Sequence, residues 1–279
     1  MQAKKSFTAG KFVFQILQGT LIGLGAVLPG ISGGVLCVVF GIYKTIMELL
    51  AAPFKNLKTH VPKLIPYVLG GAIGFLGIAN ILSFLLERYP APSVCVFIGL
   101  IGGMLPSLFR EAGEQGRNKY SYISMGISAL LIFALLIGLK VLSVEITPNF
   151  LWYVFCGGCL ALSVIAPGMS FSTLLMPLGL YEPFVSGIGH LDFGILIPGG
   201  IGGLATVLLF AGAVNLLFEK HYSVAFHGII GIVIAATVMI IPFGSFMVSV
   251  GSFAINAACI IVGIVASVLL DRFNRKYSI

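Results

Sequence analysis

Seven stretches of at least 20 residues in this 279-residue chain contain no Asp, Glu, Lys or Arg. A helix needs about 20 mainly apolar residues to cross the hydrocarbon core of a bilayer. Charged residues make up 9% of the chain and hydrophobic residues 58%, whereas a soluble domain carries roughly 25% charged residues. The sequence therefore predicts an all-α polytopic membrane protein. It excludes a soluble enzyme, a disordered chain and a nucleic-acid binder.

Six single crossings are expected. Four of the uncharged stretches have the length of one span, and a fifth, residues 222–270, is long enough for two. The segment 241–245, with its Pro and Gly, divides that fifth stretch. The predicted spans are 64–86, 92–109, 121–143, 193–217, 224–241 and 246–269.

The two remaining segments, 12–50 and 150–186, are each interrupted by Pro-Gly, at Pro29-Gly30 and at Pro167-Gly168. Pro removes a backbone donor and Gly loosens a helix. Irregular backbone at membrane depth must be buried in protein or line a cavity. Each half-segment has roughly 17 residues, which is short for a span. We therefore favour two re-entrant helical hairpins; the alternative is an ordinary turn outside the membrane between two full spans.

The positive charges set the expected orientation. Cytoplasmic loops of membrane proteins carry an excess of Lys and Arg. If the N-terminus is cytoplasmic, only Arg88 and Lys140 among the 16 Lys and Arg residues fall on the outer side. We expect a multi-pass protein of the cytoplasmic membrane with both termini in the cytoplasm. No signal-peptide cleavage pattern follows a short apolar region, so we expect the N-terminus to be retained.

The two interrupted segments also match each other. Pro29-Gly30-Ile31-Ser32 aligns with Pro167-Gly168-Met169-Ser170, and Gly41-Ile42-Tyr43 aligns with Gly179-Leu180-Tyr181 at the same shift of 138. Each half then holds one hairpin and three spans, and an odd number of crossings inverts the second half. We predict repeat one over 1–145 and inverted repeat two over 146–279, an architecture known from secondary transporters.

The interrupted segments suggest an anion site. A helix that begins inside the protein points unpaired N–H groups and partial positive charge into it, and phosphates bind at such ends. The alternative is that the small residues only cap and pack their helices. Arg88 and Lys140 could attract an anionic headgroup from outside, or merely anchor span ends. The predicted headgroup contacts are Ser32, Gly33, Gly34, Ser170, Ser172, Thr173, Arg88 and Lys140.

Few other residues suggest chemistry. Glu48, Glu182 and His227 are candidates for ion coupling, although a packed neutral imidazole is the simpler interpretation of His227. Cys156 and Cys159 form a C-x-x-C pair, but no nearby Cys or His pair completes four zinc ligands. We therefore expect neither a metal nor a cofactor. Hydrolase, protease and nucleotide-binding motifs are absent from the sequence, which favours transport over catalysis.

Several of these motifs resemble a known family. Leu-Pro-Gly-Ile-Ser-Gly-Gly-Val at 28–35 and Ala-Pro-Gly-Met-Ser at 166–170 are similar to the PopT-type polyprenyl-phosphate translocases, as is the segment Phe97–Ser107. The family often has Gly where Phe171 stands. The resemblance implies that the protein returns the carrier lipid undecaprenyl phosphate from the outer to the cytoplasmic leaflet for envelope glycan synthesis. The alternative is a secondary transporter of a small soluble anion. The oligomeric state and the driving force stay open.

Overall fold

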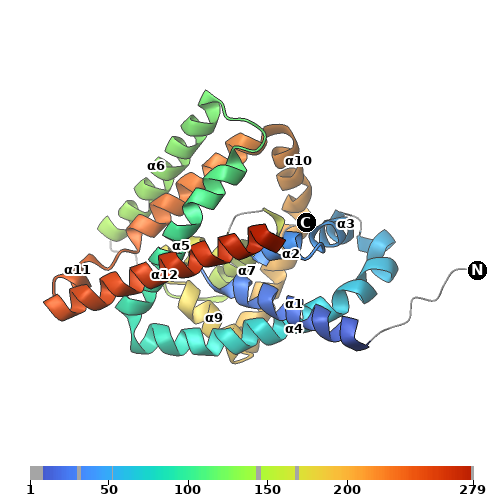
Figure 1. The fold of residues 1–279 in the computed structure, drawn as a ribbon, viewed down its shortest axis with the longest axis horizontal. Helices are drawn as coiled ribbons and strands as arrows, with labels where there is room; N and C mark the ends of the chain where they lie inside the picture. Colours follow the sequence, from blue (N-terminus) through green and yellow to red (C-terminus); the bar gives the residue numbers. More distant parts are fainter. Residues whose placement is uncertain (1–8, 30–32, 52, 143–145, 167–169, 278–279) are drawn as a thin grey trace, which may run out of the picture.

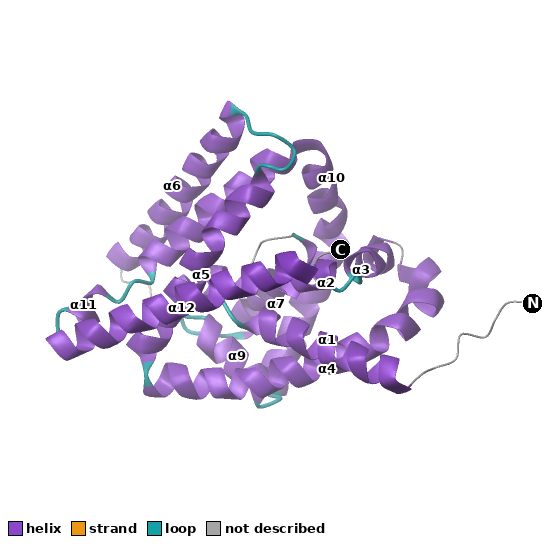
Figure 2. Cartoon of the chain, in the orientation of Figure 1, coloured by secondary structure: helices purple, strands orange, loops and turns teal. Residues whose placement is uncertain are grey.

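Every regular element is a helix within the residues that the structure describes, which are 9–29, 33–51, 53–142, 146–166 and 170–277 of a computed structural model (Figures 1 and 2). This confirms the all-α class. The elements are α1 (Ala9–Val27), α2 (Gly33–Val39), α3 (Tyr43–Ala51), α4 (Pro53–Arg88), α5 (Pro90–Ala112), α6 (Lys119–Val141), α7 (Phe150–Ile165), α8 (Phe171–Leu175), η1 (Met176–Leu178), α9 (Tyr181–Gly189), α10 (Phe193–Met239), α11 (Phe243–Phe246) and α12 (Val250–Tyr277).

Six helical stretches are long and apolar enough to cross a membrane. All but Pro90–Ala112 carry exposed large apolar side chains: Leu130 is 69% exposed, Leu208 64% and Val262 61%. Such a surface suits lipid and not water. The protein is therefore a multi-pass membrane protein. The six stretches are Asn56–Arg88, Pro90–Ala112, Lys119–Val141, Phe193–Val214, Leu216–Met239 and Val250–Arg272.

Two helices are longer than the predicted spans. Helix α4 begins at Pro53, whereas the first span was predicted from residue 64. The extra turns contain Lys58 and Lys63. Lys is a good helix former, so the helix continues through these residues although their charges end the apolar span. Helix α10 covers the first two predicted spans of the second half, and between them it is kinked at His221, whose φ of −136° and ψ of 42° are non-helical.

The interrupted segments fold into short helices. In each, a first helix, α1 or α7, ends just before the Pro, and α7 is 16 residues long, or about 24 Å. This is less than the roughly 30 Å of a bilayer core. Ala166, directly before Pro167, leaves the helix with φ −98° and ψ 108°, because a following Pro disfavours helical backbone. The lengths agree with re-entrant hairpins, which stay a prediction.

Glycines bring each first helix against the long helix that follows it. Helix α1 packs on α4 (Figure 1), and a Cβ at Gly19 would lie 2.3 Å from the carbonyl oxygen of Tyr67. Helix α7 packs on α10, and a Cβ at Gly157 would lie 1.8 Å from the carbonyl oxygen of Gly199. Only backbones without side chains can approach so closely. The same crossing is thus built twice.

The remaining spans pair across the two halves. Helix α5 packs on α12, where a Cβ at Gly99 would lie 2.1 Å from the Ile260 carbonyl oxygen and one at Gly103 2.9 Å from that of Ile264. Helix α6 packs on the second part of α10 in the same manner. In both pairs residue numbers rise together along the contact, so the paired helices run parallel. The second span of each half therefore contacts the third span of the other.

Candidate functional site

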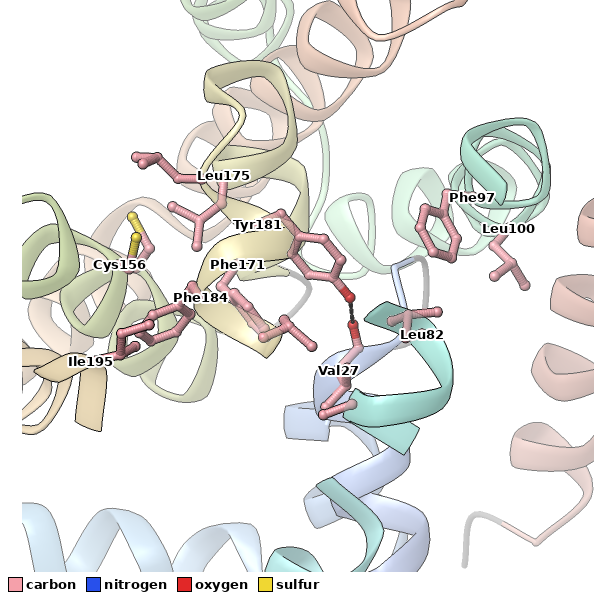
Figure 3. Packing of buried hydrophobic residues seen from close by; sticks show 14 residues of the cluster. Val27, Leu82, Phe97, Leu100, Cys156, Phe171, Leu175, Tyr181, Phe184 and Ile195 are labelled. Carbon is pink, nitrogen blue, oxygen red and sulfur yellow. Dashed lines mark hydrogen bonds between the residues drawn. The ribbon is translucent and has the colours of Figure 1, made fainter. Parts of the chain in front are cut away.

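Two tyrosines join the points where the hairpins are interrupted. The hydroxyl of Tyr181 donates a 2.5 Å hydrogen bond to the carbonyl of Val27, two residues before Pro29 (Figure 3). The hydroxyl of Tyr43 donates a 3.2 Å hydrogen bond to the carbonyl of Ile165, two residues before Pro167. Each hairpin thus holds the end of the other's first helix. The two interruptions consequently meet inside the protein.

These bonds answer a need created by the interruptions. The last carbonyls of a helix lack partners within it, and buried carbonyls need one. The sequence already contained the signal, because each tyrosine stands 14 residues after the Pro of its own hairpin. In the sequence, Tyr43 and Tyr181 serve only to align the two halves. Their bonds to the opposite half depend on how the hairpins face each other, which the sequence alone did not show.

The second hairpin places three hydroxyls together. The Oγ atoms of Ser170 and Ser172 are 2.7 Å apart, and the Thr173 hydroxyl donates to the Ser170 carbonyl at 2.5 Å. All three side chains are buried. Ser170 stands at the start of α8, but its side chain makes no capping hydrogen bond. The Ser170 side chain therefore does not cap α8 in this conformation.

The serine pair keeps donor capacity. One hydroxyl donates to the other, so one of the two hydrogens has no acceptor among the described residues. That hydrogen is available to a phosphate oxygen without breaking the pair. The pair is closed off from solvent, since Ser170 is 5% exposed and Ser172 is 0% exposed. Any ligand of the pair would therefore need the surrounding chain to move.

The first hairpin has a different arrangement. Pro29 and Gly34 are buried, and Gly33 packs on α1, where a Cβ would lie 3.1 Å from that of Ala26. No hydroxyl pair like that of the second hairpin occurs among its described residues. Four predicted site residues lie outside the part of the chain that the structure describes: Gly30, Ser32, Pro167 and Gly168.

Phe171 turns into the hydrophobic core. Its ring is fully buried, with its centroid 5.7 Å from that of Tyr181 and 6.3 Å from that of Phe184 (Figure 3). The Phe171 ring therefore packs with other ring side chains and does not lie between the hydroxyls of Ser170 and Ser172. A bulky residue between the two serines is accommodated because its side chain leaves the site.

The predicted outer cations are not part of the hydroxyl cluster. Arg88 ends α4 and Lys140 lies one residue before the end of α6, and both are exposed. Neither side chain forms a hydrogen bond or ion pair with another described residue. The hydrogen-bond partners of Ser170, Ser172 and Thr173 are all uncharged. Arg88 and Lys140 as headgroup contacts therefore stay a prediction.

The two candidate coupling carboxylates differ in environment. Glu182 accepts a 3.4 Å hydrogen bond from Ser83 and lines a cavity of about 310 Å³ together with Tyr181. Glu182 is half-buried, and the carboxylate of Glu87 is its neighbour. Glu48 is exposed on α3 and lies 2.7 Å from His60, whose hydrogen bond lowers the pKa of Glu48. Only Glu182 therefore lies beside the meeting point of the hairpins.

His227 is fully buried. Its Nδ1 lies 2.7 Å from the carbonyl oxygen of Ser223, and a carbonyl can only accept, so Nδ1 carries the hydrogen. Its Nε2 has no partner among the described residues. The ring packs against Phe109 and Tyr122, which is the packed arrangement named above as the simpler interpretation. A coupling role stays a prediction.

The part of the chain that the structure describes holds no group of three or more His, Cys, Asp or Glu side chains that could bind a metal ion. Cys156 and Cys159 are both buried in α7 and unpaired. Their environment is that of packing residues in a helix interface.

Comparisons with known proteins agree on one family. The undecaprenyl phosphate translocase-like family matches residues 3–119 and 64–253. A polyprenyl-phosphate transporter of Vibrio cholerae is 25% identical over 252 residues, which cover 84% of this chain and 80% of that protein. A polyprenyl-phosphate transporter of Staphylococcus aureus is 25% identical over 275 residues, 94% of this chain and 96% of that protein. No solved structure matches.

The matched residues extend from the first hairpin through both interruptions to the last loop. They include the tyrosines that hold the two helix ends and the serine pair of the second hairpin. The chain belongs to the undecaprenyl phosphate translocase-like family.

Proposed function

We propose that this protein returns undecaprenyl phosphate from the outer to the cytoplasmic leaflet. The family and the two relatives named as polyprenyl-phosphate transporters support this substrate. The physical requirement is simple. A long prenyl chain is at home in lipid, and only the charged phosphate needs protein to avoid hydrocarbon, where an unpaired charge is very costly.

One observation carries the proposal: each hairpin bonds the end of the other's first helix, and the second hairpin holds a buried hydroxyl pair whose neighbour Phe171 packs on Tyr181. The pair offers a hydrogen to a phosphate oxygen inside the protein. Because the pair is buried in the described conformation, the headgroup enters when a hairpin moves. Breaking the Tyr181–Val27 bond frees one helix end, and breaking the Tyr43–Ile165 bond frees the other. We propose that the two bonds open in turn, one toward each leaflet.

We infer that the second half is inverted relative to the first. Consecutive spans cross a membrane in opposite directions. In a repeat without inversion, the second span of one half would run antiparallel to the third span of the other. The contacts of α5 with α12, and of α6 with α10, run parallel instead. Inversion of one half gives this direction for both pairs at once.

We propose that both termini face the cytoplasm. An ion pair of 3.1 Å between Arg110 and Asp271 supports this by placing the ends of α5 and α12 on one side, the side expected for the basic loop after α5. Single-cysteine labelling in a cysteine-free background tests the orientation. A cysteine at position 56 should resist an impermeant reagent applied from outside, and labelling there would overturn the topology.

Transport itself is tested in liposomes that contain the purified protein and undecaprenyl phosphate. The Ser170→Ala, Ser172→Ala double variant should lower flux per folded molecule by about ten- to a hundredfold, because an oriented donor to an anion contributes about 1.5–3 kcal/mol. Ser163→Ala is the matched control, since that hydroxyl bonds only the Leu160 carbonyl of its own helix. Normal flux in the double variant would refute the site.

The same liposomes separate the alternative function. A transporter of a small soluble anion would take up inorganic phosphate or a similar ion and leave the lipid in its leaflet. Lipid movement by the wild-type protein without soluble-anion uptake is the result expected here. The opposite pattern would replace the proposed substrate class.

A further inference from the structure

A long apolar groove lies beside the meeting point of the hairpins. Its volume is about 580 Å³, and α4, α7, α9 and α10 form its walls. Every lining residue is apolar or Gly, including Val68, Phe75, Leu160, Val164, Phe184 and Gly200. Val68 is 65% exposed and Leu191, another lining residue, 54%. The groove is therefore open on the surface that faces lipid.

One wall of the groove packs against the residue between the two serines. Phe184 lines the groove, and its ring packs against that of Phe171, which stands between Ser170 and Ser172 in the chain. Val164 lines it as well and directly precedes Ile165, whose carbonyl holds Tyr43. A molecule lying in the groove would thus have one end within a few residues of the proposed phosphate site.

Glycines shape the floor. Gly157, Gly199 and Gly203 all line the groove at the crossing of α7 and α10. Along α10 the lining residues extend from Ile195 to Val207, which corresponds to about 18 Å of helix. A floor without side chains leaves room for a chain that carries a methyl branch at regular intervals. A straight saturated chain would leave part of this width empty, and an unfilled gap forfeits dispersion contacts.

We propose that this groove holds the phosphate-proximal isoprenoid units of the transported lipid while its phosphate is at the hydroxyl pair. The inference rests on the proposed function and adds a recognition site for the chain. Lipid tails are as apolar as the groove, so hydrophobicity cannot provide selectivity. Selectivity comes from the fit of the branched chain. The groove distinguishes prenyl phosphates from straight alkyl phosphates of the same headgroup.

Two glycines of α10 give a matched test. A Cβ at Gly200 or at Gly212 would meet no other atom within 4 Å, so both positions accept a larger residue without a backbone clash. Gly200 lines the groove and Gly212 does not. Gly200→Leu should fill the groove, whereas Gly212→Leu adds the same side chain to the same helix elsewhere. Both variants should fold like the wild-type protein.

The measurement is flux per folded molecule for undecaprenyl phosphate and for dodecyl phosphate in liposomes. Wild-type protein and Gly212→Leu should prefer the prenyl lipid. Gly200→Leu should lower flux of the prenyl lipid about tenfold, in keeping with the effect of small changes in apolar pockets, and should lose the preference. A photoreactive prenyl phosphate should label α4, α7, α9 or α10 in the wild-type protein.

The outcomes are separable. If wild-type protein moves no prenyl phosphate, the proposed function fails. If it does, but Gly200→Leu behaves like Gly212→Leu, or wild type moves both phosphates equally, the function stands and the groove proposal is overturned. Photolabelling confined to other helices would overturn it too.

Discussion

The two hairpins make the same backbone contacts but differ in the side chains packed around them. In both, a glycine crossing fixes the first helix on the following long helix, and a tyrosine donates to the helix end of the other half. The residue after the aligned serine differs. It is Gly33 in the first hairpin, packed on α1, and Phe171 in the second, buried in the core. Backbone contacts are repeated, whereas side-chain packing is not.

The two tyrosines also differ in how deeply they are buried. Tyr181 is 2% exposed and lies in the large central cluster with Phe171 and Phe97, whereas Tyr43 is half-buried beside a smaller cluster around Cys37 and Ile42. A hydrogen bond inside an apolar cluster costs more to break, because the freed groups find no water. We therefore expect the Tyr43 bond to open more easily than the Tyr181 bond, and so to open first.

We expect the largest effect from adding a methyl group at the glycine crossings, because it disrupts the backbone contacts that the two hairpins share. Gly157→Ala would place Cβ 1.8 Å from the Gly199 carbonyl oxygen, and Gly19→Ala would place it 2.3 Å from that of Tyr67. Since both contacts are to backbone, we expect loss of most monodisperse folded protein in each variant, measured by size-exclusion chromatography. Gly212→Ala, with open space at Cβ, should fold normally. Normal yield from either crossing variant would contradict the close approach.

Next in size is the unequal packing. Phe171→Ala should lower the free energy of unfolding by about 3–5 kcal/mol, because it leaves a cavity in a fully buried cluster. Gly33→Ala adds a Cβ 3.1 Å from that of Ala26 and should change stability by less than about 1 kcal/mol. Denaturant unfolding in detergent micelles gives both values. Equal effects would mean that the two hairpins are packed alike.

The tyrosine bonds should show a smaller difference. Tyr181→Phe leaves the Val27 carbonyl buried without its partner and should cost about 1–3 kcal/mol. Tyr43→Phe should cost less, about 0.5–1.5 kcal/mol, because its surroundings are only partly buried. Thermal unfolding of both variants, with Tyr120→Phe as an exposed control, ranks them. A larger loss from Tyr43→Phe would reverse the proposed order of opening.

The smallest effect is expected from the outer cations. Arg88→Gln should reduce capture of the lipid from the outer leaflet by less than about tenfold, and high salt should erase the difference, because exposed charges are screened over about 8–10 Å. Lys140→Gln should act more weakly, since Lys lacks the bidentate fork of Arg. Flux normalised to folded protein is the readout, with Lys58→Gln as the control. Unchanged flux in the Arg88→Gln, Lys140→Gln double variant would eliminate a capture role.

Much of the fold followed from the sequence. Hydrophobic length and the scarcity of charge fixed the class and the number of spanning stretches, because a bilayer admits only helices that satisfy their own backbone. The Pro-Gly pairs located both interruptions, since Pro cannot continue a helix. The charges near residue 220 also indicated the boundary between two spans: the backbone of α10 is non-helical at His221, and an apolar stretch long enough to cross a membrane lies on each side of the kink.

The site was only partly readable. Residue type indicated that Ser170, Ser172 and Thr173 belong to the interruption, because small hydroxyl residues follow each Pro-Gly. That Ser170 bonds Ser172 and not the start of α8, and that Phe171 turns away from both, depended on packing against Tyr181 and Phe184. Side-chain direction is set by neighbours that lie far apart in the chain.

Local sequence rules thus determined where the backbone stops being helical, since those rules act within a few residues. Only the tertiary structure decided which distant group satisfies each helix end. Val27 and Tyr181 are 154 residues apart, and Tyr43 and Ile165 are 122 apart. Such pairs form when the two halves pack on each other, as α5 does on α12 at Gly99 and Gly263. Nothing in the sequence around a helix end that precedes a Pro indicates which distant group will bond it.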